Sequence, residues 1–317
     1  MNQHLHYLAI DLGGTKTAVS VGRADGQLGP EHRMPTEADH DPLRWRDRLA
    51  VLIAEAMAEA GLRPDQMATV GLAVPGPMSV TQGRILAPPN MPAWRNVPVR
   101  TWVEELTGRP VHLNNDANAA ALAEYRFGAF RGVPDLVYLT MSTGVGGGVI
   151  AGGRLLQGSC DLAGEVGHMV LDPNGPPCPC GQRGCLEMYC GGRNVLQQVR
   201  HDLARGKASS LRAQMDQLTI SALARAAGDG DALARSYWET FLVRLAQCIG
   251  ILLMCYNRSA IVMGTIAIHL GETLLQPLRE RLPRYAWAPS RQGVQVAASQ
   301  LGPRIGDLGA LALALPP

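Results

Sequence analysis

The sequence predicts an α/β protein built from two halves of similar topology. Short apolar strands alternate with helical segments along the 317 residues, a pattern typical of α/β folds. A strand, a glycine turn and a second strand occur near the N-terminus and recur 130 positions later, with Gly14 aligned on Gly144. Such a recurrence indicates that one supersecondary unit is used twice. Because no long linker separates the halves, we expect two lobes with a cleft between them.

The first half is expected to contain strands over residues 7–11, 17–21, 69–74 and 111–113. Its first two strands form a hairpin around the turn LGGT. The pair Asp41-Pro42, a cap followed by a first-turn proline, begins a helix that ends at Gly61. Asp116 begins an alanine-rich helix that ends at Gly128.

The second half begins the same pattern again, with a strand over 137–141, a glycine-rich turn over 142–148 and a further short strand. Residues 193 to about 284 are expected to be mostly helical, with an amphipathic run over 231–255 and an interrupting strand at 260–264. A last helix is expected over 306–315. We therefore expect a first lobe of residues 1–117 together with about 300–317, and a second lobe of residues 118–299.

The composition is that of an ordinary soluble protein, with 46% hydrophobic residues, 18% charged residues and a net charge of +2. No basic run or stripe points to a nucleic acid or a membrane surface as a partner. The N-terminus lacks the charged and apolar regions of a secretory signal. The apolar run over 248–255 is shorter than the roughly 20 residues that span a bilayer. A cytoplasmic location is expected.

One histidine and three cysteines lie in the short stretch 167–187, GHMVLDPNGPPCPCGQRGCLE. Soft thiolates and one imidazole make a closed tetrahedral set for structural Zn²⁺. A redox site would use C-x-x-C, which is absent, and a disulfide would leave one cysteine over in a reducing compartment. Four protein ligands leave no open position on the metal, which argues against a zinc hydrolase. The four cysteines outside this stretch are interpreted as small buried hydrophobic residues.

Two glycine turns carry the chemistry of phosphate binding. The first glycine turn, residues 11–16 (DLGGTK), presents backbone N–H groups and a hydroxyl to a phosphate, and its aspartate can hold hydrated Mg²⁺. It is not a Walker A sequence, and taken alone it also fits a plain hairpin. The second glycine turn, residues 142–148 (STGVGGG), lacks the following helix of a dinucleotide fingerprint. Two such turns in matching places predict a shared polyphosphate.

Three acidic residues are candidates for work on a hydroxyl group. Asp116 lies where a strand passes into a helix, at the positive end of the helix dipole. One interpretation is a helix N-cap, a role that Asp116 or Asn115 would fill; the other is that Asp116 is a general base, with the neighbouring asparagines orienting the attacking hydroxyl. Glu165 and Glu187 bracket the cysteine-rich stretch and are either solvated charges or fixed hydrogen-bond acceptors for a polyol.

The motifs AIDLGGTK, GLAVPGP, NNDANAAALAE, STGVGGG, AGEVGH, CPCGQRGCLE and GDLGA extend from residue 9 to residue 310. Together they resemble the ROK family (repressors, open reading frames and sugar kinases). The resemblance implies a two-lobed actin-like, ribonuclease H-like ATPase fold with a cleft between the lobes.

The resemblance also implies roles for particular residues. The ATP phosphates and Mg²⁺ are expected at Asp11, Gly13, Gly14, Thr15, Lys16, Thr143, Gly144, Gly146 and Gly264. The catalytic base is expected to be Asp116. The sugar is expected at Asn90, Asn115, Glu165, His168 and Glu187, and Zn²⁺ at His168, Cys178, Cys180 and Cys185. His168 would then hold the metal with one ring nitrogen and serve a sugar hydroxyl or a second partner with the other.

The chain departs from the family pattern at two positions. Ser142 stands where a glycine is usual, and Gly264 is followed by Thr265-Ile266 in place of further glycines. In relatives the loop at Gly264 approaches the nucleotide, so polyphosphate stays open as an alternative donor to ATP.

The expected activity is ATP-dependent phosphorylation of a hexose at its 6-hydroxyl, with glucose as the first candidate. The alternatives are an N-acetylmannosamine or N-acetylglucosamine kinase, a kinase for fructose or allose, and a sugar sensor without catalysis. Ten residues precede Asp11, too few for the winged helix of the repressor branch, which favours a kinase. Relatives are often homodimers, and a homodimer is expected here.

Overall fold

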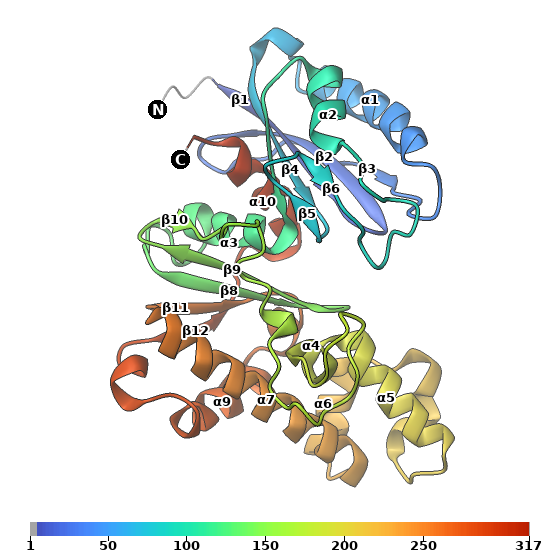
Figure 1. Ribbon diagram of the computed structural model, residues 1–317, viewed down its shortest axis with the longest axis vertical. Helices are drawn as coiled ribbons and strands as arrows, with labels where there is room; N and C mark the ends of the chain where they lie inside the picture. The colour runs from blue at the N-terminus through green and yellow to red at the C-terminus, as the bar shows by residue number, and fades with distance from the viewer. Residues whose placement is uncertain (1–4, 317) are drawn as a thin grey trace. The chain divides into compact units, whose positions relative to one another are not determined.

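The protein is described by a computed structural model that covers residues 5–316 and forms two compact units (Figure 1). The first unit holds the residues up to Pro134, Gly148–Ala163 and the residues from Leu301 on, and the second holds Asp135–Gly147 and Gly164–Gln300. This division differs from the expected one, which placed most of the helix after Asp116 in the second lobe. The ends of the expected first lobe, residues 1–4 and 317, lie outside the described residues.

The first unit is built on a five-stranded sheet with the order β3-β2-β1-β4-β7. Its strands are β1 (His6–Leu12), β2 (Lys16–Arg23), β3 (His32–Pro35), β4 (Met67–Val74) and β7 (Val111–Asn115). The first three strands pair antiparallel, whereas β4 and β7 run parallel to β1. Alternate residues of β1 enter two different hydrophobic cores. Leu8 and Ile10 share one core with Trp45. Tyr7 and Ala9 share the other with Leu311.

Four helices accompany this sheet, namely α1 (Pro42–Glu59), α2 (Val99–Thr107), α3 (Asp116–Phe127) and α10 (Ile305–Ala314), together with the small hairpin β5 (Met78–Ser79) and β6 (Arg84–Ile85). The α10 helix, from the far end of the chain, packs against α3, β1 and β4 (Figure 1). Small residues allow this approach, because a Cβ on Gly71 would overlap the backbone of α10 and one on Gly309 would press on Ala119. This long-range packing places α3 in the first unit.

The second sheet has the order β10-β9-β8-β11-β12, which repeats the order of the first. Its strands are β8 (Leu136–Met141), β9 (Val145–Ala151), β10 (Arg154–Leu155), β11 (Ala260–Met263) and β12 (Gln295–Ala298). The recurrence predicted from the sequence is therefore present in the strand order. The glycine run is not all turn, however, because β9 begins at Val145 and the boundary between the units falls between Gly147 and Gly148.

The remaining helices belong to the second unit and are α4 (Leu186–Cys190), α5 (Gly192–Ala204), α6 (Ile220–Gly228), α7 (Ala232–Tyr256), α8 (Ile266–Leu270) and α9 (Glu272–Arg281). Among the described residues, α7 is long and apolar enough to cross a membrane by length and composition. It packs against α4, α6 and α9, and 56% of its apolar window is buried within the protein. These contacts make α7 the core helix of its unit.

Candidate functional site

The first glycine turn is held by hydrogen bonds to three of its carbonyl groups. The N–H of Gly13 donates to the carbonyl of Lys16 at 2.9 Å, and Thr36 donates its N–H to the carbonyl of Thr15 and its hydroxyl to the carbonyl of Gly13. Within residues 5–316, no acceptor is found for the N–H groups of Gly14 and Thr15, which are exposed. These two donors fit an anion, whereas the N–H of Gly13 is used by the turn itself.

A buried hydrogen-bond network supports this turn. The hydroxyls of Thr17 and Thr36 lie 3.0 Å apart, and the indole Nε1 of Trp45 donates to the Thr17 hydroxyl at 2.8 Å. All three residues are buried. Sequence reasoning missed this network, because its members lie in β2, just after β3 and in α1, and no motif joins them. A satisfied buried network of this kind holds a turn in one conformation.

Three carboxylates gather at the end of β1. Burial and the negative charges of Asp116 and Asp307 raise the pKa of Asp11 to about 7. The Asp307 carboxylate accepts from Nε of Arg304 at 2.9 Å, and a Cβ on Gly306 would overlap the Asp11 carboxylate. Such a cluster favours a bound cation, which fits the expected role of Asp11 toward Mg²⁺. The part of Asp307 was not predicted, although it lies in the GDLGA motif.

The N-cap of α3 is Asn115 rather than Asp116. The Asn115 side-chain oxygen accepts from the N–H of Asn118 at 2.6 Å. The side-chain oxygen of Asn114 accepts from the backbone N–H of Asn115 and the amide of Asn118, both at 2.9 Å. Of the two capping candidates, Asn115 thus takes the role, and Asp116 is not needed as the cap.

Asp116 occupies the first position of α3, and one of its carboxylate oxygens accepts from the N–H of Ala117 at 2.8 Å. The residue is exposed by its surface area, while the protein atoms packed around its carboxyl desolvate that group and raise its pKa, against the lowering effect of the Ala117 N–H. The exposed surface shows that the residue is open to solvent on one side. Asn90 is also exposed, in a turn where Met91 lies next to Gly14.

The second glycine turn is held by α4 and α5. The N–H groups of Gly192 and Arg193 donate to the carbonyls of Ser142 and Thr143, at 2.8 and 3.1 Å. The N–H of Val145 donates to Oε2 of Glu187 at 2.8 Å. Thr143 is exposed, and both Gly144 and Gly146 are partly buried. Glu187 was predicted to bind a sugar, but one of its carboxylate oxygens supports the turn.

The loop after β11 is fixed by two neighbouring residues. Gly264 is buried against the Tyr138 hydroxyl and donates its N–H to the carbonyl of Leu139 at 2.8 Å, so this residue has no backbone donor to offer a phosphate. Thr265 has a φ of 39°, which is strained for a β-branched residue. Its hydroxyl accepts from the N–H of Met141 and lies 3.2 Å from the hydroxyl of Thr140. Thr265 thereby ties this loop to the strand that leads into the second glycine turn.

The four predicted metal ligands lie together and form the Cys₃His cluster, His168, Cys178, Cys180 and Cys185. Their ligand atoms all lie within 4.8 Å of one another. Nδ1 of His168 is 3.7 Å from Sγ of Cys178, and Sγ of Cys180 is 3.6 Å from Sγ of Cys185. A tetrahedral metal with bonds of about 2.3 Å to sulfur requires ligand separations of about 3.8 Å, so these residues fit such an ion.

The Cys₃His cluster is anchored to α7. Asp172, on the loop between His168 and the cysteines, accepts from Arg244 of α7 at 2.7 Å. The Arg244 guanidinium also lies 4.8 Å from the ring centre of Tyr189. Burial raises the pKa of the Cys185 thiol to about 12, so a bound cation is needed to keep this sulfur as a thiolate. Glu165 is exposed and directly precedes the 3₁₀ helix Val166–His168.

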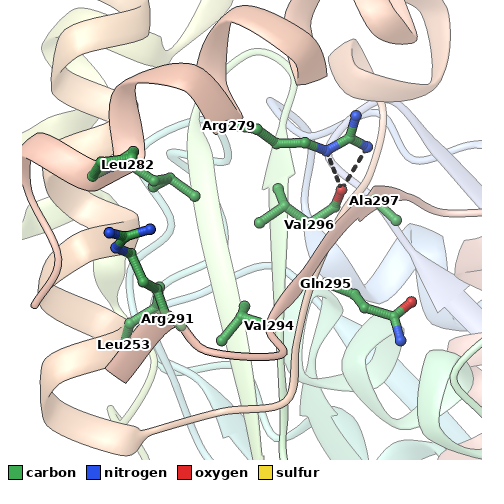
Figure 2. A pocket seen from close by; sticks show the side chains of 9 residues that line it. Leu253, Arg279, Leu282, Arg291, Val294, Gln295, Val296 and Ala297 are labelled. Carbon is green, nitrogen blue, oxygen red and sulfur yellow. Dashed lines mark hydrogen bonds between the residues drawn. The ribbon is translucent and has the colours of Figure 1, made fainter. Parts of the chain in front are cut away.

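A separate hollow of about 410 Å³ lies in the second unit between the end of α7, α9 and β12 (Figure 2). None of the predicted site residues lines it. Figure 2 shows the guanidinium of Arg279 donating to the carbonyl of Val296, so this arginine braces the edge strand β12.

The ROK family model matches residues 7–316. The chain is 33% identical to a glucokinase of Thermotoga maritima over 313 residues, 98% of this chain and 97% of the relative. It is 34% identical to an N-acetylmannosamine kinase of Escherichia coli over 310 residues, 97% of each chain.

Two solved structures share the fold over 98% of this chain. A ROK family glucokinase from Streptomyces griseus in complex with glucose and AMPPNP is 31% identical, with a TM-score of 0.79 and 99% of that chain covered. A ROK family transcriptional regulator, a homologue of the Escherichia coli MLC protein, is 26% identical, with a TM-score of 0.86 and 78% of that chain covered. The chain belongs to the ROK family.

Proposed function

We propose that this protein is a sugar kinase that transfers the γ-phosphoryl group of ATP to the 6-hydroxyl of a hexose, with glucose as the first candidate. The observation that carries the proposal is the position of Asp116. It is an exposed carboxylate at the first position of α3 whose capping role is taken by Asn115. The named kinases among its relatives support the same class of reaction.

In this mechanism the Asp116 carboxylate accepts the proton of the sugar hydroxyl while the hydroxyl oxygen attacks the γ-phosphorus and ADP leaves. The free N–H groups of Gly14 and Thr15 hold phosphate oxygens, and Lys16 adds a positive charge to the same turn. Asp11 would hold the Mg²⁺ that accompanies the nucleotide, and this ion would supply neutralising charge. Most of the acceleration then comes from positioning and electrostatics rather than from covalent chemistry.

The sugar is assigned to Asn90, Asn115, Glu165, His168 and Glu187. His168 directs Nδ1 toward the cysteines, so Nε2 is the ring nitrogen that would serve a hydroxyl or a second partner. Glu187 would use its other carboxylate oxygen, since Oε2 accepts from Val145. Discrimination between hydroxyls requires such acceptors to be held in fixed positions, as Glu187 is by its place in the first turn of α4.

Zn²⁺ is the proposed ion of the Cys₃His cluster, because three thiolates and one imidazole suit it and four protein ligands close its coordination. Its role is structural. A homodimer and a cytoplasmic location complete the proposal, on the basis of the resemblance and the composition. Elemental analysis of the purified protein, and its mass in solution, test the ion and the oligomeric state.

An N-acetylmannosamine kinase is the second candidate, favoured by the relative at 34% identity. A coupled ADP-release assay with Mg-ATP tests both across glucose, N-acetylmannosamine, N-acetylglucosamine, fructose, mannose and allose. A kcat/KM for glucose at least about tenfold above the others, a transition-state difference near 1.4 kcal/mol, would support the first candidate. Binding of a sugar without turnover from ATP or polyphosphate would contradict the kinase and favour a sensor.

A further inference from the structure

We propose that Glu187 is a positioning residue that couples the Cys₃His cluster to the second glycine turn, so that metal binding sets the conformation of a nucleotide-binding segment. The inference rests on the proposed function for the identity of the ligand at that turn. The coupling itself rests on contacts within the second unit.

The contact to the turn is short and enclosed. The Val145 N–H donates to Oε2 of Glu187 at 2.8 Å, and Val145 is only 8% exposed. A Cβ on Gly144 would overlap the same carboxylate oxygen, so a side chain there would displace Glu187. Loss of this carboxylate would leave a buried N–H without its acceptor, which is costly.

The contact to the cluster runs through a single helical turn. Cys185 is the N-cap of α4, and Glu187 lies in the first turn of that helix. The Glu187 carbonyl accepts from Gly191 at 2.9 Å and from the Asn194 amide at 3.2 Å, which holds its backbone in place. Because Cys185 and Glu187 share the first turn of α4, a displacement of Cys185 is expected to strain this anchored turn and shift the Glu187 carboxylate.

The other side of the cluster reaches the same residue, Val145. Gly167, which precedes the ligand His168, lies so close to the Val145 carbonyl that a Cβ would overlap it. The N–H of Leu186 donates to the carbonyl of Met169 at 2.9 Å and joins the two ligand segments. The strand residue Val145 is thus held on its N–H side by the segment after Cys185 and on its carbonyl side by the segment before His168.

This arrangement predicts that the metal strengthens nucleotide binding although the metal and the nucleotide do not touch. His168 and Cys185 would hold the ion between them, and this would fix both supports of Val145. Without such a link, Glu187 and Gly167 would be free to separate, and residues 142–145 would lose part of their support.

The test measures amide hydrogen exchange at Val145 in the zinc-loaded protein without nucleotide, for the wild type and Glu187→Ala. We expect exchange about tenfold faster in Glu187→Ala, the size expected from loss of one buried hydrogen bond. Zinc content should stay unchanged. Chelation should accelerate the wild type in the same way and add little in Glu187→Ala, because the two changes remove one coupling. Gln182→Ala, an exposed residue between the cysteines, is the matched control and should behave as wild type.

The affinity for Mg-ADP, measured by calorimetry, should fall in parallel with faster exchange. Unchanged exchange at Val145 in Glu187→Ala would overturn the proposal, and so would full acceleration by chelation in that variant. If Glu187→Ala fails to fold, Glu187→Gln replaces it and should show a smaller acceleration. Loss of zinc from both variants would make Glu187 part of the metal site and contradict a positioning role. Because exchange needs no turnover, a protein that phosphorylates no sugar but shows this coupling would refute only the proposed function.

Discussion

The two glycine turns occupy matching places in two sheets of the same strand order, yet they are supported by different chemistry. The first turn is braced by hydroxyl groups and an indole from the core of its unit, Thr36, Thr17 and Trp45. The second is braced by a carboxylate, Glu187, that stands beside a metal cluster. The two turns therefore share a topology but are stabilised by different interactions. A substitution that weakens the support of one turn should leave the other unchanged.

The largest difference is expected when the metal is lost. Cys185→Ser removes one of four ligands, and we expect the free energy of unfolding of the second unit to fall by several kcal/mol, since structural zinc contributes directly to folding. Cys160→Ser is the control, because Cys160 lies outside the cluster; it and Cys255 are exposed, against the expected burial, whereas Cys190 and Cys248 are buried as expected. Exchange should rise over 164–190 and 142–148 but not over 11–16. Zinc-free purified protein with three freely titratable thiols in this stretch would contradict the metal account.

A smaller effect should be confined to the first turn. Thr36→Val keeps the side-chain shape but removes the hydroxyl that donates to Gly13, at a cost of about 1–3 kcal/mol. The KM for Mg-ATP should rise, and exchange at 142–148 should not change. Thr107→Val removes a hydroxyl that donates to Val103 within α2 and accepts from the N–H of Arg109 just after the helix, and it controls for loss of a hydroxyl elsewhere in the unit. Equal effects of both variants on KM would argue against the brace.

The acidic cluster makes the first turn sensitive to pH. The pKa of Asp11 is raised to about 7 by burial and by the charges of Asp116 and Asp307. Since the ionised carboxylate is the form that holds Mg²⁺, kcat/KM for Mg-ATP should fall as the pH drops through 7. Asp307→Asn removes one negative neighbour, so the acid limb should move to lower pH by less than about one unit. A shift to higher pH would contradict the electrostatic explanation.

The smallest effect is expected at Thr265. Glycine would relieve the strain of a positive φ but lose the hydroxyl contacts to Met141 and Thr140, two terms of about 1–2 kcal/mol and of opposite sign. Stability should therefore change little in Thr265→Gly, as measured by denaturant unfolding. Thr265→Val keeps the strain without the hydroxyl and should be clearly less stable. Equal stability of the two variants would show that strain is not stored there.

Local signals predicted much of the fold, because caps and glycine stops act within a few residues. The helix from Asp116 ends at Gly128 as expected, and the helix after Asp41 begins at Pro42. The four-residue edge strands β3 and β12 gave no comparable pattern. The place of α3 in the first unit depends on packing against α10, which is far away in the sequence.

The candidate site divides in the same way. The four metal ligands were recognisable because their residue types and spacing are themselves the signal. The bond between Val145 and Glu187 joins residues 42 positions apart and has no motif. The choice of Asn115 over Asp116 as the cap depends on side-chain geometry, which spacing does not determine. Functional residues that act through another residue were therefore the ones that sequence reasoning missed.

The most direct test of the central claim is the turnover of Asp116→Asn on its best sugar substrate. The base assignment predicts a kcat about 10²–10⁴-fold lower, the usual contribution of a general base. Sugar affinity and stability should remain near wild type, because Asn115 still caps α3. Near-normal turnover in a folded, sugar-binding Asp116→Asn would contradict the proposed mechanism.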